Sequence, residues 1–335
     1  MGEYIRRVQL TGGTTLTVSL PKDWAAELGL KPGSLMRLIP RRSSGLLLIP
    51  EGLEENRREA RLVVRDDTKA EMLLRDLISL YLAGYDIIKI EFLTPHPLLK
   101  LHLKDNMRRK LMGVEILKES VTEMLLQCFA QHVELPLNEA LSRQAELAAS
   151  MQRDATTSLI TGDRELAEEV IQRDDEVDKL FYFIGRQLNL AAELPKVLQE
   201  FRMENAMACL SYAMVTKAIE RIGDHASNIA SASLSIEGGI EEQLATEIRN
   251  LDERVKNIFL ESIAVLLRKD GRAANSIIEK VEDVRKLYAE NLEKVTTPKI
   301  SPKKSSLLRM ALGDWMRIAE YSADISEQAI FLSLL

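Results

Sequence analysis

Two pairs of acidic residues have the spacing of one helical turn, Asp174 with Asp178 and Glu220 with Asp224. Side chains four residues apart lie on one face of an α-helix, where two negative charges repel each other unless a positive charge lies between them. At about 100° per residue, the face of the first pair also carries apolar residues such as Val177, so these carboxylates project from a packing face. A carboxylate in such a place is costly unless it is paired, protonated or bound to a metal. The first pair therefore indicates a metal site.

The second pair, Glu220 and Asp224, allows two interpretations. Lys217 borders it on one side, which favours an exposed charged face, and Gly223 on the other side leaves room for an ion or an approaching helix. Carboxylates from two facing helices suit Mg, Mn, Fe or Zn, with positions open for water or an anion. His225 lies about 100° round the helix from Asp224, so we expect it to form a hydrogen bond or to pack rather than to bind metal. The expected ligands of a divalent or trivalent metal, whose identity the acids do not select, are Asp174, Asp178, Glu220 and Asp224.

These acids lie in an internal repeat. VIQRDDEVDKLF at 170–181 aligns with IIEKVEDVRKLY at 277–288, and IERIGDHASNIA at 219–230 aligns with AEYSADISEQAI at 319–330. Self-similarity of this kind indicates two copies of one supersecondary unit that bury their apolar faces against each other.

The second copy retains only part of the acidic set. Glu320 and Asp324 persist and Glu327 joins their face, but Val281 and Arg285 stand where the first copy has its first acidic pair. Arg285 is available to neutralise the remaining acids in place of a cation. We therefore expect a weaker second site, or none, at Glu320, Asp324 and Glu327.

The elements that carry the acids are helices. From residue 137 onward the apolar periodicity predicts about six long helices, interrupted by glycine and proline at five places. The breaks fall at Gly162, Pro195, Gly238-Gly239, Gly271 and Pro298 to Pro302. They predict two tandem three-helix bundles, 137–236 and 240–335.

The phrases RDDEVDKL at 173–180 and AIERIGDHASNIA at 218–230 resemble the signature of the PhoU family of phosphate-uptake regulators. The resemblance covers roughly residues 137–335. It implies two three-helix bundles whose Glu/Asp-x-x-x-Asp motifs bind multinuclear metal clusters, in a protein that represses phosphate-uptake signalling.

The first fifty residues differ in charge from the rest. They carry seven basic and three acidic side chains, a net charge of +4, which leaves −10 for the remainder of a chain whose total is −6. Segregated charge suggests different partners for the two parts. Five short elements are predicted in this segment: strands at Ile5–Leu10, Leu16–Leu20, Ser34–Ile39 and Leu46–Ile49, and a helix at Lys22–Leu30. So few residues cannot bury a core of their own, so we expect a partner chain and a homodimer.

The order of these elements, with the phrase LTVSLPKDWAAELGLKPGSLMRL, resembles the swapped-hairpin domain of the AbrB/SpoVT/MazE family, in which two chains interleave their strands. The resemblance implies a dimerisation and DNA-binding domain at 1–52. Thr17 and Ala25-Ala26 occupy positions where DNA-binding members often carry arginine, so a domain that only dimerises is the alternative. The candidate contacts to duplex DNA are Arg6, Arg7, Arg37, Arg41 and Arg42.

A small α/β sandwich is predicted at 60–135, between these two parts. Helical periodicity at Lys69–Ala83 and Leu98–Met112 alternates with apolar runs typical of strands at Arg61–Arg65, Ile87–Leu93, Val114–Ser120 and Glu123–Ala130.

Cys128 and Cys209 stand in apolar surroundings without the spacing of a zinc site, and we expect both to be core residues. No run reaches the roughly 18 apolar residues of a membrane span and the start lacks a signal sequence, so we expect a cytoplasmic protein that is not embedded in a membrane.

The predicted fold is multidomain and mainly α, with an N-terminal swapped-hairpin β domain, a small α/β sandwich and two tandem PhoU-like bundles. The favoured function is a phosphate-uptake regulator that binds DNA as a dimer, with metal-loaded bundles that respond to phosphate status or to a signalling partner. The alternative is an adaptor of a phosphate transporter or kinase that does not bind DNA. A metal-dependent phosphoesterase is disfavoured because no positioned base, nucleophile or phosphate-gripping loop accompanies the acids, so we expect no enzyme.

Overall fold

The computed structural model describes residues 3–40, 45–51, 57–129 and 135–335, with 202, 204 and 237 left out. The chain divides into two compact units, Met1–Arg57 and Arg58–Leu335. The boundary falls in the interval between the predicted domains 1–52 and 60–135. The fold is multidomain and mainly α-helical, as predicted.

The described residues of the first unit form two hairpins and a short helix. Strands β1 (Gln9–Thr11) and β2 (Thr15–Thr17) pair antiparallel, α1 (Lys22–Glu27) follows, and β3 (Met36–Pro40) pairs antiparallel with β4 (Leu46–Pro50). The predicted strands Ile5–Leu10 and Leu16–Leu20 were wrong in extent, because regular pairing is confined to the residues next to the turn, 9–11 and 15–17. In the described part of this single chain, the segments 5–8 and 18–20 have no strand beside them. In this hairpin Leu10 lies opposite Leu16.

None of the described residues of the first unit is buried. Several of its large apolar side chains are more than half exposed: Ile5, Val8, Leu10, Leu16, Val18, Leu35, Leu38 and Leu46. A single copy of this unit therefore has no hydrophobic core among the residues described.

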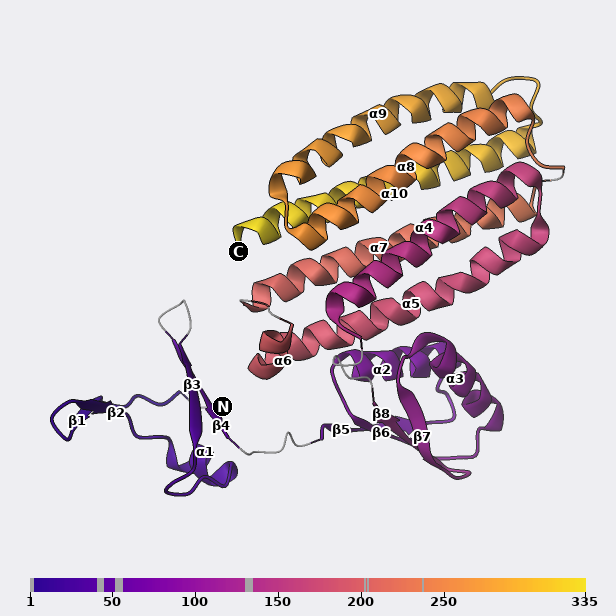
Figure 1. The fold of residues 1–335 in the computed structure, drawn as a ribbon. Coiled ribbons are helices and arrows are strands. Elements are labelled where there is room, and N and C mark those ends of the chain that lie inside the picture. Colours follow the sequence, from indigo (N-terminus) through magenta and orange to yellow (C-terminus); the bar gives the residue numbers. More distant parts are fainter. Residues whose placement is uncertain are drawn as a thin grey trace. The chain divides into compact units, whose positions relative to one another are not determined.

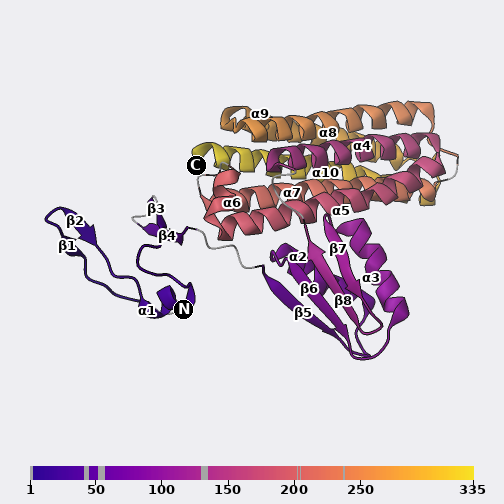
Figure 2. The ribbon, with the colours of Figure 1, turned by 60° about the horizontal axis from the view of Figure 1, so that its bottom comes forward.

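The second unit begins with a mixed sheet covered on one face by two helices. Its elements are β5 (Glu59–Val64), α2 (Ala70–Leu82), β6 (Ile87–Phe92), α3 (Pro97–Lys110), β7 (Val114–Glu119) and β8 (Glu123–Cys128). The strands lie in the order β5-β6-β8-β7 (Figure 2), with β5 parallel to β6 and the other neighbours antiparallel. Alternate residues of β6 enter a core shared with α2 and α3, as the period of two requires. The predicted α/β sandwich is confirmed, and Cys128 is buried in it with a free thiol.

In the described residues from 135 onward, seven helices follow (Figure 1). They are α4 (Leu137–Thr161), α5 (Arg164–Glu193), α6 (Pro195–Glu200) and α7 (Ala206–Leu234), then α8 (Glu242–Arg268), α9 (Gly271–Val295) and α10 (Pro302–Leu334). Each copy of the repeat supplies three long helices, and the first copy adds the short α6. Gly162 ends α4 in the left-handed conformation at φ +77°, and Asp163 caps α5 by accepting a hydrogen bond from the Leu166 amide.

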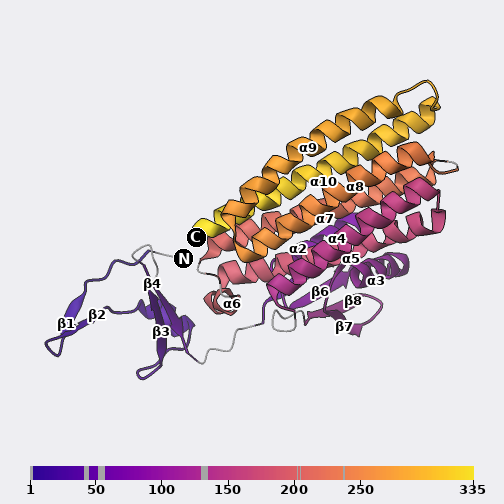
Figure 3. The ribbon, with the colours of Figure 1, turned by 45° about the horizontal axis from the view of Figure 1, so that its top comes forward.

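The two copies share one continuous hydrophobic core, which includes the free, buried Cys209. Figure 3 shows their six long helices side by side along a common direction. Within the described residues, no helix has both the length and the apolar character needed to cross a membrane.

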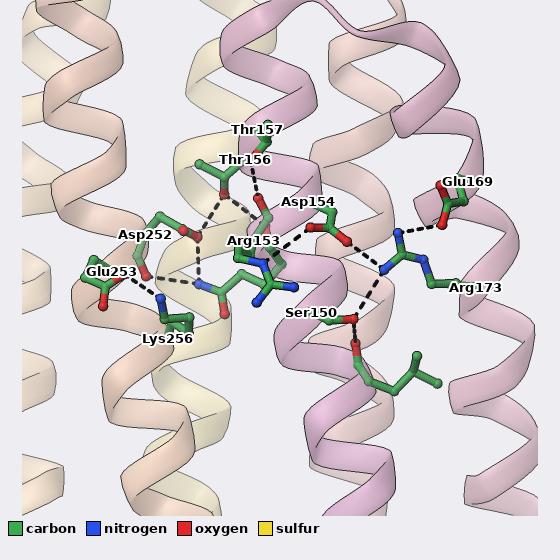
Figure 4. A network of polar contacts seen from close by, with 12 residues as sticks. Ser150, Arg153, Asp154, Thr156, Thr157, Glu169, Arg173, Asp252, Glu253 and Lys256 are labelled. Carbon is green, nitrogen blue, oxygen red and sulfur yellow. Dashed lines mark hydrogen bonds and ion pairs between the residues drawn. The ribbon is translucent and has the colours of Figure 1, made fainter.

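Polar contacts inside the core join the two copies (Figure 4). The Asp252 carboxylate of α8 is 6% exposed, and its Oδ1 accepts hydrogen bonds from Gln152 Nε2 and Thr156 Oγ1 of α4, both at 2.8 Å. Trp315 Nε1 of α10 donates to the same oxygen at 3.0 Å. On the opposite side of α4, Arg173 of α5 pairs with Asp154 at 2.7 Å. Asp252 therefore ties the first copy to both helices of the second that pack on it.

Candidate functional site: a carboxylate cluster between α5 and α7

Helices α5 and α7 pack closely where they carry the predicted acidic pairs. A Cβ atom at Gly223 would lie 3.2 Å from Val177 Cγ1 and 3.4 Å from Asp174 Oδ1. The glycine thus allows Asp174 of α5 to lie against the backbone of α7. The expectation that Gly223 leaves room for an approaching helix is confirmed.

The four carboxylates form one electrostatic group. Burial, followed by repulsion from Asp224, Asp178 and Glu220, raises the pKa of Asp174 to about 7. Burial is also the largest cause of the raised pKa values of Glu220 and Asp224. Glu220 is 8% exposed, so the interpretation of the second pair as an exposed charged face was wrong. The positive charge of Lys110 acts in the opposite direction and lowers the pKa of Asp174.

Two lysines contact the cluster. Lys110 Nζ, at the end of α3, lies 2.7 Å from Asp178 Oδ2, and Lys217 Nζ of α7 donates to Glu220 Oε1. The second oxygen of Glu220, Oε2, is buried and has no hydrogen-bond partner within the described part of the chain. The charged nitrogen paired with it, Arg221 Nε, is 3.8 Å away. Lys110 was missed by sequence reasoning. The signal that could have singled it out is the basic run that ends α3.

In this arrangement, no group of three His, Cys, Asp or Glu side chains among the described residues is positioned to hold a metal ion. Asp178 and Glu220 are each directed to a lysine instead. The donor set nevertheless consists of carboxylate oxygens that repel one another and include a buried oxygen without a hydrogen bond, and such a set fits a hard cation. The metal site at Asp174, Asp178, Glu220 and Asp224 stays a prediction.

The corresponding acids of the second copy are arranged differently. Glu320 pairs with Arg317 at 2.7 Å and with Arg285 at 3.9 Å, so the proposed neutralisation by Arg285 is present. Asp324 and Glu327 are exposed. Positive charges of the second copy itself thus neutralise Glu320, while Asp324 and Glu327 are exposed.

His225 links the bundles. Its Nδ1 lies 2.7 Å from Asp314 Oδ1 of α10, and its ring stacks on Tyr321 with centroids 5.7 Å apart. The hydrogen-bonding and packing role expected from the sequence is confirmed.

Of the arginines predicted to contact DNA, three lie in the described part of the chain. Arg6 and Arg7 are exposed, and Arg37 is exposed and paired with Glu51 at 3.2 Å. Arg41 and Arg42 lie outside the described residues.

Comparison with known families finds two matches. The PhoU domain matches residues 141–233 and 244–329, which together make up more than half of the chain. The family described as "antidote-toxin recognition MazE, bacterial antitoxin" matches residues 9–56.

Similar proteins carry the description phosphate-specific transport system accessory protein PhoU homolog. The protein from Pseudomonas putida is 26% identical over 224 residues, which cover 64% of this chain and 84% of the relative. That from Clostridium acetobutylicum is 26% identical over 152 residues, 45% of this chain and 68% of the relative. The crystal structure of PhoU from Pseudomonas aeruginosa superposes with a TM-score of 0.50 at 23% identity, over 60% of this chain and 98% of the other, a likeness that concerns the fold.

Proposed function

This chain belongs to the PhoU family, and from that membership we propose that it is an accessory regulator of phosphate transport rather than an enzyme. Its relatives are described as accessory proteins of the phosphate-specific transport system, and they match this chain over much of their length. A component of that transport system, or a kinase that signals its state, is the proposed protein partner. The observation that carries the proposal is the pair of repeated bundles, of which the first holds a carboxylate cluster between α5 and α7.

The cluster is proposed to bind a hard cation through Asp174, Asp178, Glu220 and Asp224. Mg, Mn, Fe and Zn are the candidates. A bound cation would neutralise the acids and could offer open positions to an oxygen ligand such as phosphate. Two observations support this assignment: Glu220 Oε2 is buried and accepts no hydrogen bond from the described residues, and burial together with the neighbouring acids raises the pKa of Asp174.

The test is elemental analysis of the purified full chain, with a matched control inside the repeat. Glu320 aligns with Glu220, so Glu320→Gln removes an equivalent acid from the second copy. Asp174→Asn and Glu220→Gln are expected to lose the metal that the wild type carries, whereas Glu320→Gln keeps it. Unchanged metal content in both first-copy variants would contradict the assignment.

The first unit is proposed to form a homodimer. None of its described residues is buried in one copy, while apolar side chains such as Leu10, Leu16 and Leu38 are more than half exposed. Burial of roughly 25 cal/mol for each Å² of apolar surface favours pairing with a second copy. A chain beginning at Arg58 is expected to lose the dimer in light scattering, and a dimer that survives this truncation would place the interface elsewhere.

Duplex DNA is the proposed partner of the dimer. Arg6 and Arg7 are exposed in a segment that carries a net positive charge, and Arg41 and Arg42 add to that charge. Arg37 is paired with Glu51, which favours the alternative of an adaptor that does not bind DNA. The two functions differ in one measurable consequence, the effect of reversing the charge at Arg6 and Arg7.

The DNA test uses the dimeric full chain and its own or phosphate-gene promoters. Binding is expected to weaken with salt by about 0.9 decade per decade of salt for each phosphate neutralised. Arg6→Glu with Arg7→Glu should abolish the retarded complex and leave the dimer intact, while the control Lys286→Glu, at an exposed site of α9, leaves both. If the wild type forms no retarded complex with any of these promoters at low salt, DNA binding is excluded and the adaptor function remains.

A further inference from the structure

The end of α3 contacts the carboxylate cluster through one lysine. Lys110 Nζ lies 2.7 Å from Asp178 Oδ2 and 3.5 Å from Asp175 Oδ1. The side chains of Lys110 and Asp178 are 24% and 15% exposed, so the pair is largely shielded from water. The Lys110 ammonium group, which belongs to the α/β domain, therefore pairs with Asp178, one of the carboxylates proposed to bind metal.

Further charged groups hold the same end of α3 on α5. The guanidinium of Arg109 pairs with Asp175, and Lys179 Nζ donates to the carbonyl of Arg108 at 3.2 Å. These contacts do not use any of the four proposed ligands. Among these contacts of α3, that of Lys110 with Asp178 is the one that a cation in the cluster would have to replace.

The other helix of the α/β domain is attached differently. Arg186 of α5, which is 1% exposed, donates from Nη1 to the carbonyls of Tyr81 and Tyr85 at 2.8 and 2.9 Å. Its Nη2 lies 3.1 Å from Asp86 Oδ1. Because this buried contact involves no acid of the cluster, the end of α2 stays attached whether or not the cluster holds a cation.

We propose that Lys110 is a tethered competitor for the cation, so that the α/β domain lowers the cation affinity of the cluster and reports its occupancy. The proposal rests on the proposed metal site. Asp178 Oδ2 cannot both accept the Lys110 ammonium and serve as a metal ligand in the same direction. When the cluster is loaded, Lys110 leaves Asp178. The last turn of α3 then keeps only the contacts of Arg109 and Lys179 and loosens, while α2 remains held by Arg186.

The proposal is tested by titrating Mn²⁺ and Mg²⁺ into metal-stripped full chain by calorimetry. Lys110→Met keeps the apolar stem and removes the charge. It is expected to tighten cation binding by about tenfold, which corresponds to about 1.4 kcal/mol. The matched control is Lys104→Met on the same helix, whose lysine is 22% exposed and pairs with Glu119 at 2.6 Å, away from the cluster. The control is expected to bind as the wild type does.

Hydrogen exchange supplies a second readout. Mn²⁺ is expected to speed amide exchange in the last turn of α3 in the wild type, leave α2 unchanged and have no such effect in Lys110→Met. Lys110→Gln repeats the test if the methionine variant unfolds. Cation binding with equal affinity in the wild type and both Lys110 variants would overturn the competition and leave the metal site standing. No binding in any of them would remove the metal site itself, and the competition with it.

Discussion

The buried guanidinium of Arg186 is predicted to be the main attachment of the α/β domain to the first bundle, and Arg186→Met tests this. The arginine makes hydrogen bonds to the two carbonyls at the end of α2 and pairs with Asp86. Its positive charge and its donors lie where the peptide dipoles of α2 leave a partial negative charge. Methionine keeps most of the apolar stem but leaves these acceptors without a partner.

The expected cost follows from these contacts. Removing one partner of a buried ion pair costs about 3–5 kcal/mol. The Asp86 side chain is 36% exposed, so water can replace part of its lost interaction, and the lower end of that range applies. We therefore expect Arg186→Met to lower the free energy of unfolding by about 3 kcal/mol.

The assay is urea unfolding followed by circular dichroism, together with hydrogen exchange at the end of α2. Asn189→Ala is the control, because Asn189 lies one turn further along α5 and donates a single hydrogen bond to the Leu82 carbonyl at 2.9 Å. Its loss should cost about 1 kcal/mol. If Arg186→Met costs no more than this control, or if exchange at the end of α2 does not rise, the anchoring role is refuted.

Three more perturbations test other parts of the structure. Asp252→Ala removes the acceptor that three buried donors share, of which Gln152 Nε2 and Thr156 Oγ1 keep a backbone carbonyl within hydrogen-bond distance, and should lower the unfolding free energy by about 2–4 kcal/mol in urea. Burial and the neighbouring acids raise the pKa of Asp174 to about 7 in the folded chain, against about 4 for an ordinary aspartate, so its contribution to stability is present below about pH 4 and is lost as the pH rises through 7. Asp174→Asn should flatten that dependence in melting curves, and an unchanged pH profile would contradict it. At Gly239, with φ +66°, a Cβ would meet the Ile160 carbonyl oxygen at 2.5 Å, so Gly239→Ala should cost about 1–3 kcal/mol in urea unfolding, more than Gly238→Ala, where φ is +75° and the space is open.

The helical elements could be predicted from the sequence because their signals are local. The breaks at Gly162 and Pro195 lie where α4 and α5 end, and the repeat alignment places the acids on equivalent helices. The same local reasoning placed the strands 34–39 and 46–49 of the first unit correctly to within two residues but made its first two strands too long. A strand needs a neighbour to pair with, and where a second chain has to supply it, apolar alternation shows only which residues could be paired.

The groups that connect the domains were not predictable in the same way. Lys110, Arg186 and Asp252 act on residues between 63 and 105 positions away in the chain, so no spacing links them to their partners. A buried charge is also rare enough that a charged residue in a helical pattern is normally assigned to the solvent face. The burial of Glu220 could not be predicted for this reason, because a lysine three residues away, Lys217, is also what the sequence of an exposed charged face contains.

The two copies of the repeat neutralise their acids by different means, and the difference bears on which copy can respond to a ligand. In the second copy Arg285 and Arg317, from α9 and α10 themselves, pair with Glu320, and Val281 removes one acid altogether. In the first copy both acids of α5 remain, and the positive charge beside Asp178 arrives from α3 of another domain. Movement of Arg285 or Arg317, which lie on the bundle's own helices, stays within the bundle, whereas movement of Lys110 displaces a group that belongs to the neighbouring domain. The first copy is therefore the one in which a change of occupancy can be transmitted beyond the bundle.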